Sequence, residues 1–380
     1  MTSDAVLMER AAEMTGLSDF GQHDDFRTGL GFLLAALDGS DLPPEMQVLM
    51  HHAWVGSLAT RLRLVESRRQ QPEIATQEIE GPVAVIGLPR TGTSALVDLL
   101  AQDPAARAPL QWETVHLFPP ANPETWSNDP RIVDFQRSLD QMMDAIPTLG
   151  ALHTFGARLP DECNTFLALD FWSPNFTARM ALPTYTEWLT VGRLEHPYLT
   201  HHWVLQHLQA HGPSGRWTLK SPFHAFAVAE LIEEYPDVML VQTHRDPIDL
   251  LPSMAGLYST LRGHKPGDSG RKATGHELLT LWGTGLRRCL TARCDPAIDE
   301  RVLDLSHRAM TKDPLGTLRT VYVRFDLPFT ANAERCFTTW LDNPAQHKSS
   351  VAFSLDDFGL TSDEVEQAFG DYRERYGAFF

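Results

Sequence analysis

VAVIGLPRTGTS, residues 83–94, joins an apolar strand to a Gly-rich turn and the start of a helix. The four apolar residues that open it predict a buried strand, and residues 94–101 place apolar side chains at helical spacing. In a strand-turn-helix unit of this kind, backbone N–H groups and the positive end of the helix dipole can hold an anion. The stretch therefore predicts a phosphate-binding loop in an α/β fold.

The loop departs from the common phosphate-binding pattern at one position. Gly87, Gly92 and Ser94 match G-x-x-x-x-G-K-[ST], but Thr93 stands where the lysine is expected. Arg90, in the middle of the turn, argues against a plain strand-to-helix connection because it offers a charged fork of donors. A sulfuryl group carries less negative charge than a terminal phosphoryl group, so donors from the protein can manage its transfer without magnesium.

The loop resembles that of the sulfotransferases that use 3′-phosphoadenosine 5′-phosphosulfate (PAPS), which is commonly written P-R-[ST]-G-[ST]. The resemblance implies a donor-binding role for its residues, which are Pro89, Arg90, Thr91, Gly92, Thr93 and Ser94. A second element of the family is a strand ending in arginine, followed by a helix that carries a serine. Residues 238–253, VMLVQTHRDPIDLLPS, match it, which implies that Arg245 and Ser253 grip the 3′-phosphate of the donor.

A third match is the segment WTLKSP, residues 217–222, which looks like the family's strand that delivers a catalytic lysine. The resemblance implies that Lys220 hydrogen-bonds the oxygen bridging phosphate and sulfate, and stabilises charge on the departing nucleotide. The alternative is a solvated lysine at a strand end. Near the C-terminus, residues 347–350 fall where relatives carry a basic segment that closes over the donor, so Lys348 is a further candidate, although the family's Arg-Lys-Gly form is absent.

The acceptor hydroxyl needs a base, because an alcohol attacks sulfur effectively only as its proton is removed. Branches of the family that resemble this chain place a glutamate shortly after the helix that follows the first loop. Glu113 occupies that position and is the candidate base. His116 and His224 compete for the role, since the ordinary pKa of histidine suits it.

Composition narrows the class of protein. The 380 residues are 43% apolar and 21% charged, which indicates a globular chain with a large core. A formal charge of −17 disfavours nucleic acid or an anionic membrane as the main partner. Four widely spaced cysteines predict free thiols, with neither a disulfide framework nor a zinc site, and no metal is expected. The N-terminus resembles no signal peptide and no stretch reaches membrane-spanning length, so we expect a cytoplasmic protein without an integral membrane segment.

Organisation along the chain indicates a helical N-terminal extension over residues 1–80 and a sulfotransferase domain over 81–380. Strand–helix units at 83–101, 216–235 and 238–262, with a further strand at 301–305 and a helix from Pro314, predict a central parallel sheet. The expected fold is therefore a P-loop-like, three-layer α/β fold. Residues 114–215 interrupt the alternation of strands and helices, and we interpret them as a helical, aromatic-rich insertion on the acceptor side.

Together these features predict sulfuryl transfer from PAPS by in-line displacement, leaving 3′-phosphoadenosine 5′-phosphate (PAP) as the product. The aromatic insertion favours a small-molecule or lipid-like hydroxyl acceptor. A P-loop small-molecule kinase and a non-catalytic nucleotide-binding relative are the alternatives. The kinase is disfavoured because the loop lacks lysine, and because the strand at 238–241 ends in the residues QTHR, 242–245, instead of a metal-binding aspartate. The sequence leaves a homo-oligomer open.

Overall fold

The computed structural model describes residues 2–343 and 351–380. Contacts divide the chain into two compact units. The sheet unit comprises residues 80–112, 130–162 and 214–380, and the helical unit comprises residues 1–79, 113–129 and 163–213.

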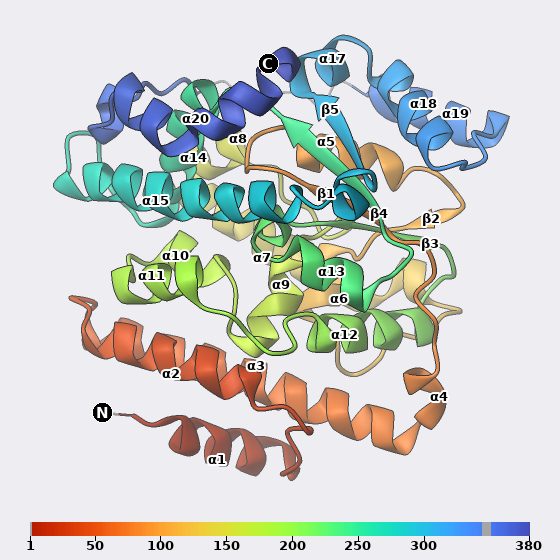
Figure 1. The fold of residues 1–380 in the computed structure, drawn as a ribbon. Helices are drawn as coiled ribbons and strands as arrows, with labels where there is room; N and C mark the ends of the chain where they lie inside the picture. The colour runs from red at the N-terminus through yellow and green to blue at the C-terminus, as the bar shows by residue number, and fades with distance from the viewer. Residues whose placement is uncertain (1, 344–350) are drawn as a thin grey trace. The chain divides into compact units, whose positions relative to one another are not determined.

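The sheet unit is built on a five-stranded parallel sheet (Figure 1). Its strands are β1 (Val83–Ile86), β2 (Ala106–Arg107), β3 (Arg216–Lys220), β4 (Met239–His244) and β5 (Val302–Ser306). They lie in the order β2-β3-β1-β4-β5, so the strand that leads into the phosphate loop is central. Parallel strands end at the same edge, and ligands of such sheets bind beyond their carboxyl ends.

Helices follow and cover these strands. In chain order the helices of the sheet unit are α5 (Thr93–Leu100), α7 (Pro130–Ala145), α8 (Pro147–Leu152), η3 (Pro222–Phe226), α13 (Val228–Glu234), α14 (Pro247–Leu261), α15 (Ser269–Ala292), α16 (Pro296–Asp299), α17 (His307–Lys312), α18 (Pro314–Arg324), α19 (Ala331–Leu341), η5 (Asp356–Phe358), α20 (Ser362–Tyr376) and η6 (Gly377–Phe379).

The two faces of the sheet carry different helices, as the period of two along a strand requires. Val85 and Val241 join a buried apolar cluster with α5, α18 and α19. The next residue of β4, Gln242, turns to the opposite face, where its Oε1 accepts a hydrogen bond from Arg293 Nη1 at 2.7 Å, just beyond the end of α15. Helices on both faces of a parallel sheet make three layers, so the predicted α/β fold is confirmed.

The helical unit has its own core. It contains α1 (Asp4–Thr15), α2 (Asp25–Asp38), α3 (Pro44–Gln70), α4 (Pro72–Ala75), η1 (Trp126–Asn128), α9 (Asn164–Leu167), η2 (Ala168–Asp170), α10 (Asn175–Arg179), α11 (Pro183–Val191) and α12 (Leu199–Ala210). A buried ion pair ties three of these segments together: Arg61 Nη1 of α3 lies 2.5 Å from Asp170 Oδ1 and donates to Thr200 Oγ1 of α12 at 3.0 Å. The short helix α6 (Gln111–Val115) spans the boundary between the units.

The units divide the chain differently from the boundaries expected from sequence. The N-terminal helices share their unit with much of the 114–215 stretch, whereas α7 and α8 of that stretch belong to the sheet unit. An amphipathic pattern shows that one face of a helix is buried, but it does not identify the partner. In the described part of the chain, no helix has both the length and the apolar character needed to cross a membrane.

Candidate active site

The loop after β1 is shaped by three residues with positive φ: Gly87 at +130°, Arg90 at +72° and Gly92 at +89°. A Cβ atom at Gly87 would lie 2.7 Å from the carbonyl oxygen of Thr243, so glycine lets the loop approach β4 closely. Arg90 has a side chain and still adopts the left-handed region, at a cost of about 1–3 kcal/mol. Thr91 Oγ1 lies 2.6 Å from Thr243 Oγ1, and this buried contact fastens the loop to β4.

Arg90, Arg245 and Ser253 come together although they were predicted from separate motifs. Arg90 Nε donates to Ser253 Oγ at 3.1 Å, and Arg245 Nη1 donates to the carbonyl oxygen of Arg90 at 3.5 Å. Burial lowers the pKa of Arg90, and the charge of Arg245 lowers it further. Two guanidinium groups held this close repel each other, so the arrangement suits an anion that would offset both charges.

Lys220 ends β3 beside the phosphate loop, as its motif predicted. In the register of the sheet it is paired with Val85 of β1. Its Nζ donates to Ser94 Oγ at 2.9 Å and forms an ion pair with Glu162 Oε1. The side chain is 5% exposed, so its ammonium group is buried and is not a solvated strand terminus.

His307 is a residue that sequence reasoning missed. It is the first residue of α17, directly after β5, and its Cδ2 would lie 2.9 Å from a Cβ atom placed on Gly92. Burial lowers the pKa of His307, and the charges of Arg245 and Arg90 lower it further. Its position immediately after a parallel strand was the available signal.

Three more titratable groups surround Lys220, and sequence reasoning missed all of them. Glu162 is the partner already described. Burial raises the pKa of Asp98 to about 6, against the opposing effect of Lys220. Burial lowers the pKa of His153 to about 4, and Lys220 and Arg90 lower it while Glu162 raises it. None of these three follows a strand, so no motif pointed to them.

The candidate bases from sequence lie in different units. Glu113 and His116 belong to the helical unit, and His224 belongs to the sheet unit. Glu113 is 2% exposed, and its Oε2 accepts a hydrogen bond from Trp126 Nε1 at 2.7 Å. His224 lies within η3, and burial lowers its pKa to about 3. Lys348 lies outside the described residues.

A buried polar network supports the end of β4, next to Arg245. His244 Nδ1 lies 2.9 Å from Tyr372 Oη of α20, and His244 Nε2 lies 2.7 Å from Asp304 Oδ1 of β5. Both carboxylate oxygens of Asp304 accept hydrogen bonds from Arg293. The charged pair and its hydrogen bonds fix the strand end from which Arg245 projects.

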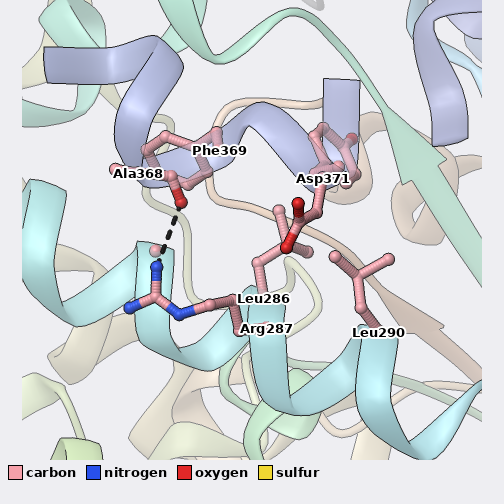
Figure 2. Close-up of a pocket in the computed structure, with 8 residues that line it drawn as sticks. Leu286, Arg287, Leu290, Ala368, Phe369 and Asp371 are labelled. Carbon is pink, nitrogen blue, oxygen red and sulfur yellow. Dashed lines mark hydrogen bonds between the residues drawn. The ribbon is translucent and has the colours of Figure 1, made fainter. Parts of the chain in front are cut away.

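A small open hollow lies between α15 and α20 (Figure 2). It measures about 160 Å³, and its lining includes Leu286, Leu290, Phe369 and Asp371. Arg287 Nη1 donates to the carbonyl oxygen of Ala368 at 3.3 Å across it. No residue of this lining is a predicted site residue, so the hollow gives no reason to place the donor there.

Comparison with known proteins agrees with this geometry. A model of the sulfotransferase family matches residues 82–331. The crystal structure of sulfotransferase STF1 from Mycobacterium tuberculosis H37Rv is 30% identical, covers 97% of this chain and 99% of its own, and has a TM-score of 0.82. Sulfotransferase STF9 from Mycobacterium avium is 28% identical over 99% of this chain and 97% of its own, with a TM-score of 0.88. A search of curated protein sequences finds no match.

Proposed function

Because the chain belongs to the sulfotransferase family, an enzyme family that transfers sulfuryl groups, we propose that its donor is PAPS and its acceptor a small-molecule or lipid-like hydroxyl. The observation that carries the proposal is the joint placement of Arg90, Arg245 and Ser253 beside a Gly-rich loop. A donor with phosphate groups at both its 3′ and 5′ positions fits that pairing of two phosphate-binding elements.

Each predicted site residue has its own role in the proposed reaction. Backbone N–H groups of the loop, with Thr93, Ser94 and Arg90, hold the 5′-phosphosulfate, while Arg245 and Ser253 hold the 3′-phosphate. Pro89, Thr91 and Gly92 set the path of the loop. Lys220 donates to the bridging oxygen as negative charge builds there, which stabilises the transition state more than the ground state.

A carboxylate removes the acceptor proton in this proposal. Glu113 is the candidate proposed from sequence, with His116 and His224 as competitors, and the structure adds Glu162 next to Lys220. The acceptor class, a homo-oligomer, a cytoplasmic location and closure by Lys348 are further proposals from the sequence.

A P-loop kinase needs a metal-binding carboxylate at the end of a strand next to the one that leads into the phosphate loop. The end of β4 instead carries Gln242, Thr243 and His244. Asp304, on the adjacent strand β5, is engaged by Arg293 and His244, and these contacts lower its pKa to about 2 in spite of the opposing effect of burial. A carboxylate held in this way is committed to a structural network. We therefore favour transfer without magnesium.

Ligand binding tests the donor. Isothermal titration should show that PAP binds without metal, and that 5′-AMP, which lacks the 3′-phosphate, binds at least about 100-fold more weakly, since two charge-assisted contacts are lost. Arg245→Ala should abolish most of this preference, while Arg137→Ala, at an exposed position, should keep it. Binding of ATP with magnesium as tight as that of PAP would contradict the proposal.

A further inference from the structure

The surroundings of Lys220 hold a carboxylate that no motif predicted. Glu162 Oε1 forms an ion pair with Lys220 Nζ, and the same ammonium group donates to Ser94 Oγ of the phosphate loop at 2.9 Å. The side chain of Glu162 is 29% exposed, against 5% for Lys220. The carboxylate is therefore the more exposed partner of an ammonium group that also contacts the phosphate loop.

We infer that Glu162 is the general base that takes the proton of the acceptor hydroxyl. This inference rests on the proposed function and deepens it. In a direct displacement, the acceptor oxygen approaches sulfur from the side opposite the bridging oxygen. A base therefore has to reach a point within a few ångströms of the group that receives Lys220, and a carboxylate in contact with that lysine meets this requirement.

The step balances with the groups named. A bond forms between the acceptor oxygen and sulfur, and the bond between sulfur and the bridging oxygen breaks. The acceptor proton passes to the carboxylate of Glu162. The electron pair of the broken bond stays on the bridging oxygen, which becomes part of the 5′-phosphate of PAP and receives a hydrogen bond from Lys220.

Histidines near the site suit the role less well. The pKa of His153 is about 4, because burial and the charges of Lys220 and Arg90 disfavour its protonated form. Burial brings the pKa of His224 to about 3. A base has to hold the proton it has taken, and these surroundings disfavour an imidazolium ion at both positions.

Two other carboxyl groups are the serious competitors. Glu113 accepts a hydrogen bond from the indole of Trp126 and is 2% exposed, which leaves it less open to an acceptor. Asp98 lies one helical turn after Ser94 on α5, so it is set back along the helix from the end that faces the phosphates. Glu162 differs from both because it contacts the lysine directly.

The experiment compares Glu162→Gln with Glu113→Gln and Asp98→Asn. Each variant is assayed with radiolabelled PAPS, with substituted phenols of increasing pKa as acceptors and with water as the common background acceptor. PAP affinity is measured by titration calorimetry and folding by the melting temperature. For Glu162→Gln we expect PAP affinity equal to or tighter than that of the wild type, because Lys220 is released, and turnover lower by about 10²–10⁴-fold.

Dependence on the acceptor separates a base from a structural residue. Loss of a base slows weakly acidic phenols more than p-nitrophenol, a much stronger acid that is already partly ionised near neutral pH. The log of the rate should therefore fall more steeply with acceptor pKa in Glu162→Gln. An equal loss with every acceptor, or the steeper fall in Glu113→Gln or Asp98→Asn instead, overturns the inference. Failure of the wild type to bind PAP counts against the donor, whereas normal PAP binding with full turnover in Glu162→Gln counts only against the base.

Discussion

Arg90 and Ser253 lie 163 positions apart in the chain, and Nε of the arginine donates a hydrogen bond to Oγ of the serine at 3.1 Å. The first residue belongs to the loop after β1 and the second to α14, which follows β4. In a central parallel sheet these strands are neighbours, so their following segments meet at one edge. The contact shows that the two motifs, each predicted from sequence to bind the donor, meet at one edge of the sheet.

Replacement of Ser253 by alanine should weaken the binding of PAP more than the binding of 5′-AMP. A hydrogen bond to a charged group contributes about 1.5–3 kcal/mol, so we expect the Kd for PAP to rise at least about tenfold in Ser253→Ala, with a smaller change for 5′-AMP. Ser138→Ala, at an exposed position on α7, is the matched control and should leave both affinities unchanged. Titration calorimetry measures both ligands, and an equal loss for the two would place Ser253 away from the 3′-phosphate.

Replacement of Lys220 by alanine should separate binding from chemistry. In the proposed reaction the lysine acts where charge builds on the leaving oxygen, so the Kd for PAP should change by less than about threefold while turnover falls at least about 100-fold. Single-turnover transfer from radiolabelled PAPS measures the chemical step. The melting temperature controls for loss of the Glu162 ion pair, and a folded Lys220→Ala enzyme with wild-type turnover would refute the assignment.

Proton uptake should accompany PAP binding through His307. Burial, Arg245 and Arg90 lower its pKa in the free protein, and phosphate groups between the arginines would offset their charge and raise it. A bound-state pKa above the free-state pKa means that binding takes up a proton and tightens as the pH falls between the two values. Calorimetry in buffers of different ionisation enthalpy counts the protons. Because PAP also titrates, the decisive quantity is the difference between wild type and His307→Asn, and no difference would contradict the prediction.

Acid should destabilise the fold in part through His224. Its pKa is about 3 in the folded chain because of burial, against about 6.5 in an unfolded chain. Between these values the unfolded state binds the extra proton, so stability falls as the pH falls, by about 1 kcal/mol from pH 6.5 to 5.5 for one such group. Chemical unfolding of His224→Gln should show a shallower decline by that amount. His276→Gln, at a half-exposed position, is the control, and parallel curves for wild type and His224→Gln would exclude the effect.

Residues that follow parallel strands were the predictable part of the site. Lys220 and Arg245 sit at or just beyond strand ends, where a parallel sheet gathers its loops, so a strand pattern and a motif were enough to place them. His307 meets the same condition and was missed because no motif marked it.

Strand patterns in the sequence could not predict the position of Glu162 beside Lys220. It reaches Lys220 from the segment between α8 and α9, which follows no strand of the sheet and carries no recognised motif. The aromatic residues of 114–215 posed a similar problem. Tyr185 Oη donates to the carbonyl oxygen of Phe171 at 2.5 Å and Phe32 stacks on Trp188, so these rings build the core of the helical unit. A sequence pattern shows that such rings are buried without showing which core they fill.

The position of β1 at the centre of the sheet governs when the site can assemble. Its neighbours β3 and β4 begin at Arg216 and Met239. Neither edge of β1 can therefore form its interstrand hydrogen bonds until these later parts of the chain have been synthesised. The loop also packs on α17, since a Cβ at Gly92 would lie 2.3 Å from Met310 Cε. Pairing between strands that are far apart in sequence is slower than the formation of local structure such as a helix. A nascent chain that stops short of Arg216 carries every residue of the phosphate loop but lacks β3, β4 with Thr243, and the α17 contact that shape it.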